Sequence, residues 1–110
     1  MNSVSKLILV AAIGTIFAGC ASPKLNTGGE KIRVLSPDEV TSCRQLGKTT
    51  ASVVSKVAGI DRPQESMEEE LETLSRNSAS KMGGDTIVPL TVIEAGKQSF
   101  IVYKCINPDG

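Results

Sequence analysis

The sequence predicts a small α+β domain: one helix packed on an antiparallel sheet of about four strands, in the order strand, strand, helix, strand, strand. Two observations carry this prediction. A single long segment has the apolar spacing of an amphipathic helix, and the segments on both sides of it alternate polar and apolar residues, as strands do. The chain has 110 residues, so one domain is expected.

The helix is predicted over residues 63–82. One narrow stripe of a helix would contain residues spaced by four, three, four and four: Met67, Leu71, Leu74, Ser78 and Met82. Ser66 with Glu69 three residues later fits a capping box at its start. The glycine pair that follows the segment is typical of a helix end.

Short alternating or β-branched segments predict the strands. They cover residues 31–35, 40–48, 86–93 and 99–106, and residues 49–57 either extend the second strand or return as a hairpin. Within them, Gly47 suggests a bulge or a close backbone approach, and Pro89 confines its strand to an edge or a bulge. Residues 94–97 (EAGK) form a plausible hairpin turn around Gly96.

Composition disfavours two classes of function. The net charge is zero, from 12 Lys+Arg and 12 Asp+Glu, and the chain has three aromatic residues, so nucleic-acid binding is not expected. There is no histidine and no recognisable nucleophile motif, so the sequence predicts no enzyme, no catalytic residue, no metal site and no cofactor.

The N-terminus has the features of a secretory signal. One lysine precedes a charge-free apolar run of 12 residues, Leu7–Ala18, which is too short to span a bilayer as a helix. Small residues follow at the position where signal peptides are cut. We therefore interpret residues 1–19 as a signal peptide, the alternative being a buried N-terminal helix.

The residues around Cys20 resemble the lipobox of bacterial lipoproteins. The motif reads Phe17-Ala18-Gly19-Cys20, with Phe17 in place of the usual leucine. The resemblance implies that Cys20 is the lipidation site, carries diacylglycerol and becomes the acylated first residue of the mature chain. An ordinary secreted protein with an unmodified Cys20 is the alternative.

The two residues after Cys20 are informative about where in the cell the protein is held. Ala21 and Ser22 stand where an aspartate is the usual inner-membrane retention signal, so the resemblance implies a cell-envelope protein anchored in the outer membrane of a Gram-negative cell and facing the periplasm. Several acyl chains hold a protein at a membrane far more firmly than one.

The two remaining cysteines, Cys43 and Cys105, form an even pair in a chain that we expect to be exported. Export favours a disulfide, because such bonds persist in oxidising compartments. Two free buried thiols, and metal or redox chemistry, are the alternatives. The predicted disulfide would staple a domain whose core is expected to be thin.

We divide the chain into three parts. Residues 1–19 are the signal peptide, residues 20–30 the lipidated cysteine and a short tether, and residues 31–110 the periplasmic α+β domain. Ten tether residues would reach at most about 35 Å when fully extended, which keeps the domain close to the membrane.

Four short motifs carry a second resemblance. They are Cys43-Arg44-Gln45-Leu46-Gly47, Leu74-Ser75-Arg76-Asn77-Ser78-Ala79, Gly83-Gly84-Asp85-Thr86-Ile87-Val88 and Tyr103-Lys104-Cys105. In this order they resemble a group of small bacterial lipoproteins that looks related to the outer-membrane sensor lipoprotein of the Rcs envelope-stress phosphorelay. The resemblance supports the fold and the Cys43–Cys105 pairing. Asp85 stands where the group usually has asparagine.

These observations lead to one expectation of function. We expect a lipid-anchored, non-enzymatic binding or accessory module that acts through contacts with another envelope protein. The alternative is a stress or redox sensor lipoprotein that signals to a partner, as the Rcs sensor does.

Overall fold

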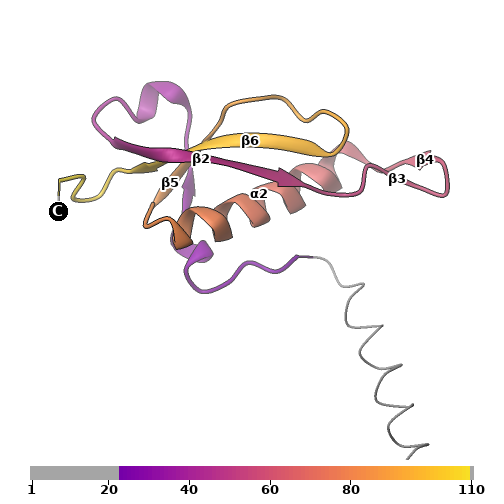
Figure 1. Ribbon diagram of the computed structural model, residues 1–110, viewed down its shortest axis with the longest axis horizontal. Coiled ribbons are helices and arrows are strands. Elements are labelled where there is room, and N and C mark those ends of the chain that lie inside the picture. The colour runs from indigo at the N-terminus through magenta and orange to yellow at the C-terminus, as the bar shows by residue number, and fades with distance from the viewer. Residues whose placement is uncertain (1–22, 110) are drawn as a thin grey trace, which may run out of the picture.

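The computed structural model describes residues 23–109. They form an α+β domain with one α-helix, a four-stranded sheet and a separate two-stranded hairpin (Figure 1). The elements of this region are η1 (Gly29–Lys31), β1 (Arg33–Val34), η2 (Pro37–Glu39), β2 (Arg44–Ser52), β3 (Lys56–Val57), β4 (Ile60–Asp61), α2 (Gln64–Lys81), β5 (Thr86–Pro89) and β6 (Lys97–Lys104). The predicted fold class is confirmed.

The four strands lie in the order β1-β5-β6-β2. β6 is antiparallel to both of its neighbours, whereas β1 runs parallel to β5, so the sheet is mixed and not wholly antiparallel as predicted. The chain enters the sheet at one edge with β1 and crosses to the other edge for β2. β1 pairs with β5 over only two residues. The alternation of polar and apolar residues in so short a strand does not indicate whether the strand runs parallel or antiparallel to its neighbour.

The second predicted strand, residues 40–48, has the expected length but begins four residues later. β2 starts at Arg44, directly after Cys43, and continues to Ser52, so part of the segment 49–57 extends this strand. The rest of that segment leads into the β3–β4 hairpin. The register of β2 against β6 shifts between Gln45 and Gly47, which confirms the predicted bulge.

Pro89 does not mark an edge strand. β5 lies between β1 and β6 inside the sheet, so the edge prediction is wrong. β1 pairs only with Thr86 and Ile87, and Pro89 ends β5 beyond the last residue of β1. The missing N–H of the proline therefore costs no bond to β1.

The predicted turn at residues 94–97 is confirmed. The backbones of Glu94 and Lys97 exchange two hydrogen bonds, of 3.0 and 2.9 Å, and Ala95 and Gly96 between them have φ values of 49° and 75°. Gly96 also lies so close to the segment after β2 that a Cβ built on it would come within 2.2 Å of the Val53 carbonyl oxygen.

The helix α2 has no capping box. It follows Pro63, and no side chain caps its first backbone N–H groups, so Ser66 lies inside the first turns rather than before them. The buried side chains of α2 recur every four residues, at Met67, Leu71, Ser75 and Ala79. This stripe faces the sheet, and it is rotated slightly from the predicted one.

The end of α2 is a Schellman motif. The N–H of Gly84 donates to the carbonyl of Ala79 at 2.9 Å, and the N–H of Gly83 donates to that of Ser80 at 3.1 Å. Gly83 has a φ of 81°, a conformation that favours glycine. The predicted helix stop at the glycine pair is confirmed.

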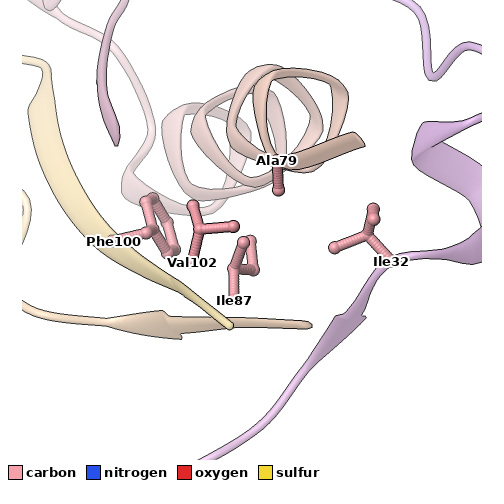
Figure 2. Packing of buried hydrophobic residues seen from close by; sticks show 5 residues of the cluster. All are labelled: Ile32, Ala79, Ile87, Phe100 and Val102. Carbon is pink, nitrogen blue, oxygen red and sulfur yellow. The ribbon is translucent and has the colours of Figure 1, made fainter. Parts of the chain in front are cut away.

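Two small clusters of buried side chains join the helix to the sheet. The first consists of Ile32, Ala79, Ile87, Phe100 and Val102 (Figure 2). The second consists of Ala51, Met67 and Leu71. α2 thus covers one face of the sheet, and Phe100 is the only aromatic side chain in either cluster among the described residues.

Candidate functional site

The predicted disulfide is present. Cys43 immediately precedes β2 and Cys105 immediately follows β6, so the antiparallel pairing of these two strands brings the cysteines together. The bond joins residues 62 positions apart. In the chain-entropy model, closing a loop of that length stabilises a fold by about 4 kcal/mol.

A carboxylate supports this end of the sheet. Asp85, in the connection from α2 to β5, accepts hydrogen bonds from the backbone N–H groups of Cys105 at 2.8 Å and Ile106 at 2.9 Å. The hydroxyl of Thr86 donates to the same carboxylate at 2.9 Å. These bonds hold the chain after β6 in place, beside the disulfide.

The environment of Asp85 favours its charged form. Partial burial alone raises the pKa of its carboxyl group, but the hydrogen bonds from Cys105, Ile106 and Thr86 and the charge of Arg33 outweigh burial, so the pKa lies below its usual range. Sequence reasoning noted Asp85 only as a departure from the asparagine that is usual in the resembling group, and it missed this role. A short acidic side chain between a helix stop and a strand was the available signal.

The first described residues are hydrogen-bonded to the rest of the domain. Asn77 on α2 accepts a hydrogen bond from the N–H of Asn26 at 2.9 Å and donates its amide to the carbonyl of Lys24 at 2.8 Å. The side chain of Asn26 in turn accepts from the N–H of Gly29 at 2.6 Å. Of the segment predicted as a tether, residues 23–30 are described, and this part is held on α2.

Arg76 extends the same attachment. Its guanidinium donates to the carbonyl oxygens of Ile32 at 3.0 Å and Glu30 at 3.3 Å. It also lies 3.9 Å from the carboxylate of Glu72, one turn earlier. Asn77 and Arg76 therefore bind backbone of the same chain, a role for which the sequence pattern gave no signal.

The attached segment runs along α2, from the first half of the helix to its C-terminal part. Pro23 lines a surface hollow together with Arg62, which precedes the helix, and with Glu69, Glu70 and Thr73 in its first half. Asn26 contacts Asn77 near the other end. The described chain therefore begins beside the first half of α2.

The sheet ends in an unusually long edge. β2 is nine residues long, and it is the terminal strand in the order β1-β5-β6-β2, so no described strand pairs with its outer side. Ser99, opposite Thr50, directs its backbone toward Leu90 and Thr91, away from β2. Thr50 therefore belongs to a non-hydrogen-bonded pair, and its own N–H and carbonyl point outward from the sheet.

Other sequence predictions concern residues beyond this region. The lipidation site Cys20 and the signal peptide at residues 1–19 lie outside the described residues. Within residues 23–109, no helix combines the length and apolar character needed to cross a bilayer. The same residues contain no group of three or more His, Cys, Asp or Glu side chains placed to hold a metal ion.

The fold and the disulfide define a class of protein, a small disulfide-bonded α+β domain in which the chain before the sheet is attached to the helix. The chain belongs to a family described as a domain of unknown function (DUF4156), whose model matches residues 23–105. No curated protein and no solved structure matches it. The matched region includes the attached segment as well as the sheet, helix and both cysteines of the disulfide.

Proposed function

We propose that the protein is a lipid-anchored, non-enzymatic binding module of the bacterial cell envelope, which binds an extended segment of another envelope protein along β2. The single observation behind the binding role is the nine-residue outer edge of that strand. An exposed edge offers a row of backbone donors and acceptors, and an added strand satisfies them by β-augmentation.

The edge carries features of a controlled binding surface. Arg44 and Lys48 are exposed along β2, and charged side chains on an edge strand disfavour indiscriminate pairing with other chains. They also favour a partner segment with acidic or polar side chains opposite them. We therefore expect a specific partner rather than self-association.

The anchor is supported by the sequence before the domain. The apolar run ends at Phe17-Ala18-Gly19-Cys20, the motif that resembles a lipobox, and the disulfide suits an exported chain. We propose that Cys20 carries the acyl chains and that the outer membrane holds the protein with the domain in the periplasm.

Replacing Cys20 with alanine tests the anchor. We expect loss of acyl mass on the N-terminal peptide and accumulation of an unprocessed or salt-extractable form, measured by mass spectrometry and membrane fractionation. Cys43→Ser serves as a control for cysteine loss, and it should keep the acyl group. Retention of the Cys20→Ala chain at the membrane after a salt wash would contradict the proposal.

Thr50 tests the binding edge. Thr50→Pro removes an outward backbone N–H, whereas Thr50→Ala keeps the N–H and loses only the hydroxyl, which lies 2.8 Å from that of Ser99. With a photocrosslinking residue at Lys48, we expect a discrete crosslinked species in cells that Thr50→Pro abolishes and Thr50→Ala retains. Equal crosslinking in both variants would contradict binding along β2.

Sensing is the second candidate function. Cys43 and Cys105 are both partly exposed, and the bond between them lies against the Asp85 network, so reduction would loosen the end of β6. Under this proposal, Cys43→Ser triggers an envelope-stress response at unchanged protein abundance. A variant that is only less stable, with no response, would leave the binding module as the better account.

A further inference from the structure

We infer that the β3–β4 hairpin is a second membrane contact, which lays Val57 and Ile60 on a zwitterionic lipid surface. This inference rests on the proposed anchor at Cys20. The hairpin projects beyond the N-terminal end of α2 (Figure 1). We choose lipid as the partner because of the hairpin's position relative to the start of the described chain.

The hairpin carries apolar side chains that are mostly exposed. Val57 is 60% exposed and Ile60 is 73% exposed, and Val54 just before the hairpin is 63% exposed. Val57 and Ile60 are directly paired in the ladder, so their side chains share one face. Exposed β-branched residues clustered at a projecting tip are typical of a contact surface.

The turn keeps that tip narrow. Ala58 and Gly59 connect the two strands, with φ values of 52° and 78°, as a two-residue type I′ turn requires. Gly59 has no neighbouring atom within 4 Å of a Cβ built on it, so the tip is open to its surroundings.

The start of the attached segment lies at the same surface hollow as the base of the hairpin. Arg62 directly follows β4, and its N–H donates to the Ser55 carbonyl at 2.9 Å, at the base of the hairpin. Arg62 and Pro23 line the same surface hollow. Cys20 is three residues before Pro23 in the sequence, and a fully extended chain spans at most about 3.6 Å per residue. Acyl chains on Cys20 would therefore enter a bilayer near the hairpin.

The local charges fit a zwitterionic surface. Lys56 and Asp61, paired across the hairpin, lie 3.8 Å apart and offset each other. Glu65 and Glu68 are exposed in the first turns of α2, so an anionic surface would be repelled. Two aliphatic side chains bind lipid weakly alone, but an anchored hairpin meets the bilayer at a high effective concentration.

The absence of tryptophan in the sequence gives a direct test. Val57→Trp places one fluorophore on the hairpin, and Val92→Trp is the matched control, because Val92 is 78% exposed and lies outside the hairpin. Both full-length proteins are purified from membranes, their acyl mass on Cys20 is measured, and they are reconstituted in phosphatidylcholine vesicles that contain lipid brominated near the headgroup.

We expect Trp fluorescence from position 57 to shift to the blue and to be quenched about twofold more strongly than that from position 92. Adding Ile60→Asp to Val57→Trp should return quenching to the level of the control. Circular dichroism and the mobility of the unreduced protein establish that all variants fold alike.

Three results would overturn the inference. Acylated protein whose Trp at position 57 is unquenched would remove the hairpin contact and leave the anchor intact. A blue shift without quenching, dependent on protein concentration, would assign the hairpin to a second copy. Absence of acyl mass on Cys20 would remove the anchor and, with it, the hairpin contact.

Discussion

The carboxylate of Asp85 accepts a hydrogen bond from the backbone N–H of Cys105, at 2.8 Å. This contact links the connection after α2 to one half of the disulfide. Because the other half, Cys43, opens the edge strand β2, three separate parts of the chain meet at this end of the sheet. The stability of this end of the sheet should therefore depend on both the Cys43–Cys105 disulfide and the Asp85 carboxylate.

We expect the domain to lose stability in acid through Asp85. The pKa of its carboxyl group is lowered in the folded state, so the ionised form stabilises the fold above the pKa of the unfolded chain. That contribution is lost as the pH falls through the folded pKa. Urea unfolding at a series of pH values between neutrality and strong acid measures it.

Asp85→Asn is the variant that tests the contribution of the Asp85 charge. The amide keeps one acceptor oxygen but turns an N–H₂ group toward one of its present donors, so we expect a loss of about 1–2 kcal/mol near neutral pH. The variant should also show a flatter dependence of unfolding free energy on pH. An unchanged slope in acid would mean that other carboxyl groups account for it.

Cys43→Ser and Cys105→Ser should each lower the free energy of unfolding by about 4 kcal/mol, because each opens the same closed loop. The double variant should lose no more than either single one. Urea unfolding with and without reductant measures the loss, and gel mobility of unreduced samples reports the bond. A mobility difference that survives either single change would contradict this pairing in solution.

Gly96→Ala should destabilise the domain by about 2–3 kcal/mol. Alanine at this position meets a strained positive φ and a carbonyl oxygen 2.2 Å from its Cβ. Gly59→Ala is the control, because it has a similar φ of 78° but open space around it, and should cost only about 1 kcal/mol. Similar losses in thermal unfolding for the two variants would show that crowding at Val53 is relieved elsewhere.

Asn77→Ala should release the attached segment while leaving the sheet intact. The change removes the partners of the Asn26 N–H and the Lys24 carbonyl, at a cost of about 1 kcal/mol. Asn77→Asp keeps the acceptor for Asn26 and is the control. Amide hydrogen exchange of Asn26 should speed up in Asn77→Ala and stay slower in Asn77→Asp. Equal exchange in both would mean that other contacts hold the segment.

Ser75→Ala should leave stability unchanged or raise it slightly. The Ser75 hydroxyl is fully buried in α2 and has no hydrogen-bond partner among the described residues. Removing an unsatisfied buried hydroxyl takes away a desolvation cost and leaves only a small change in volume. A marked loss in thermal unfolding would reveal a hydrogen bond for this hydroxyl in solution.

Local sequence patterns predicted the helix and the turns well, but they predicted the arrangement of the strands in the sheet poorly. The spacing from Met67 onward predicted α2, and the turn around Gly96 and the bulge near Gly47 were predicted from glycine chemistry alone. The parallel partner of β1 and the interior position of Pro89 depend on strand order, which short segments do not encode.

The candidate functional residues also divide into those that the sequence predicted and those that it did not. The pairing of Cys43 with Cys105 was predicted because it follows from a count of cysteines and an expected compartment. Asp85, Arg76 and Asn77 act on backbone groups of residues distant in the chain, and such contacts leave no periodic trace in a sequence. Only the three-dimensional arrangement reveals them.

The parallel pairing of β1 with β5 also sets when the domain can fold during synthesis. Both strands that precede α2 in the sheet, β1 and β2, pair only with β5 and β6, which follow it. A nascent chain that lacks residues 86–104 can close no part of this ladder, and such distant pairing slows folding. The proposed signal peptide would thus be complete well before the sheet can form, and a translocation apparatus that binds it would meet a chain that is still unfolded.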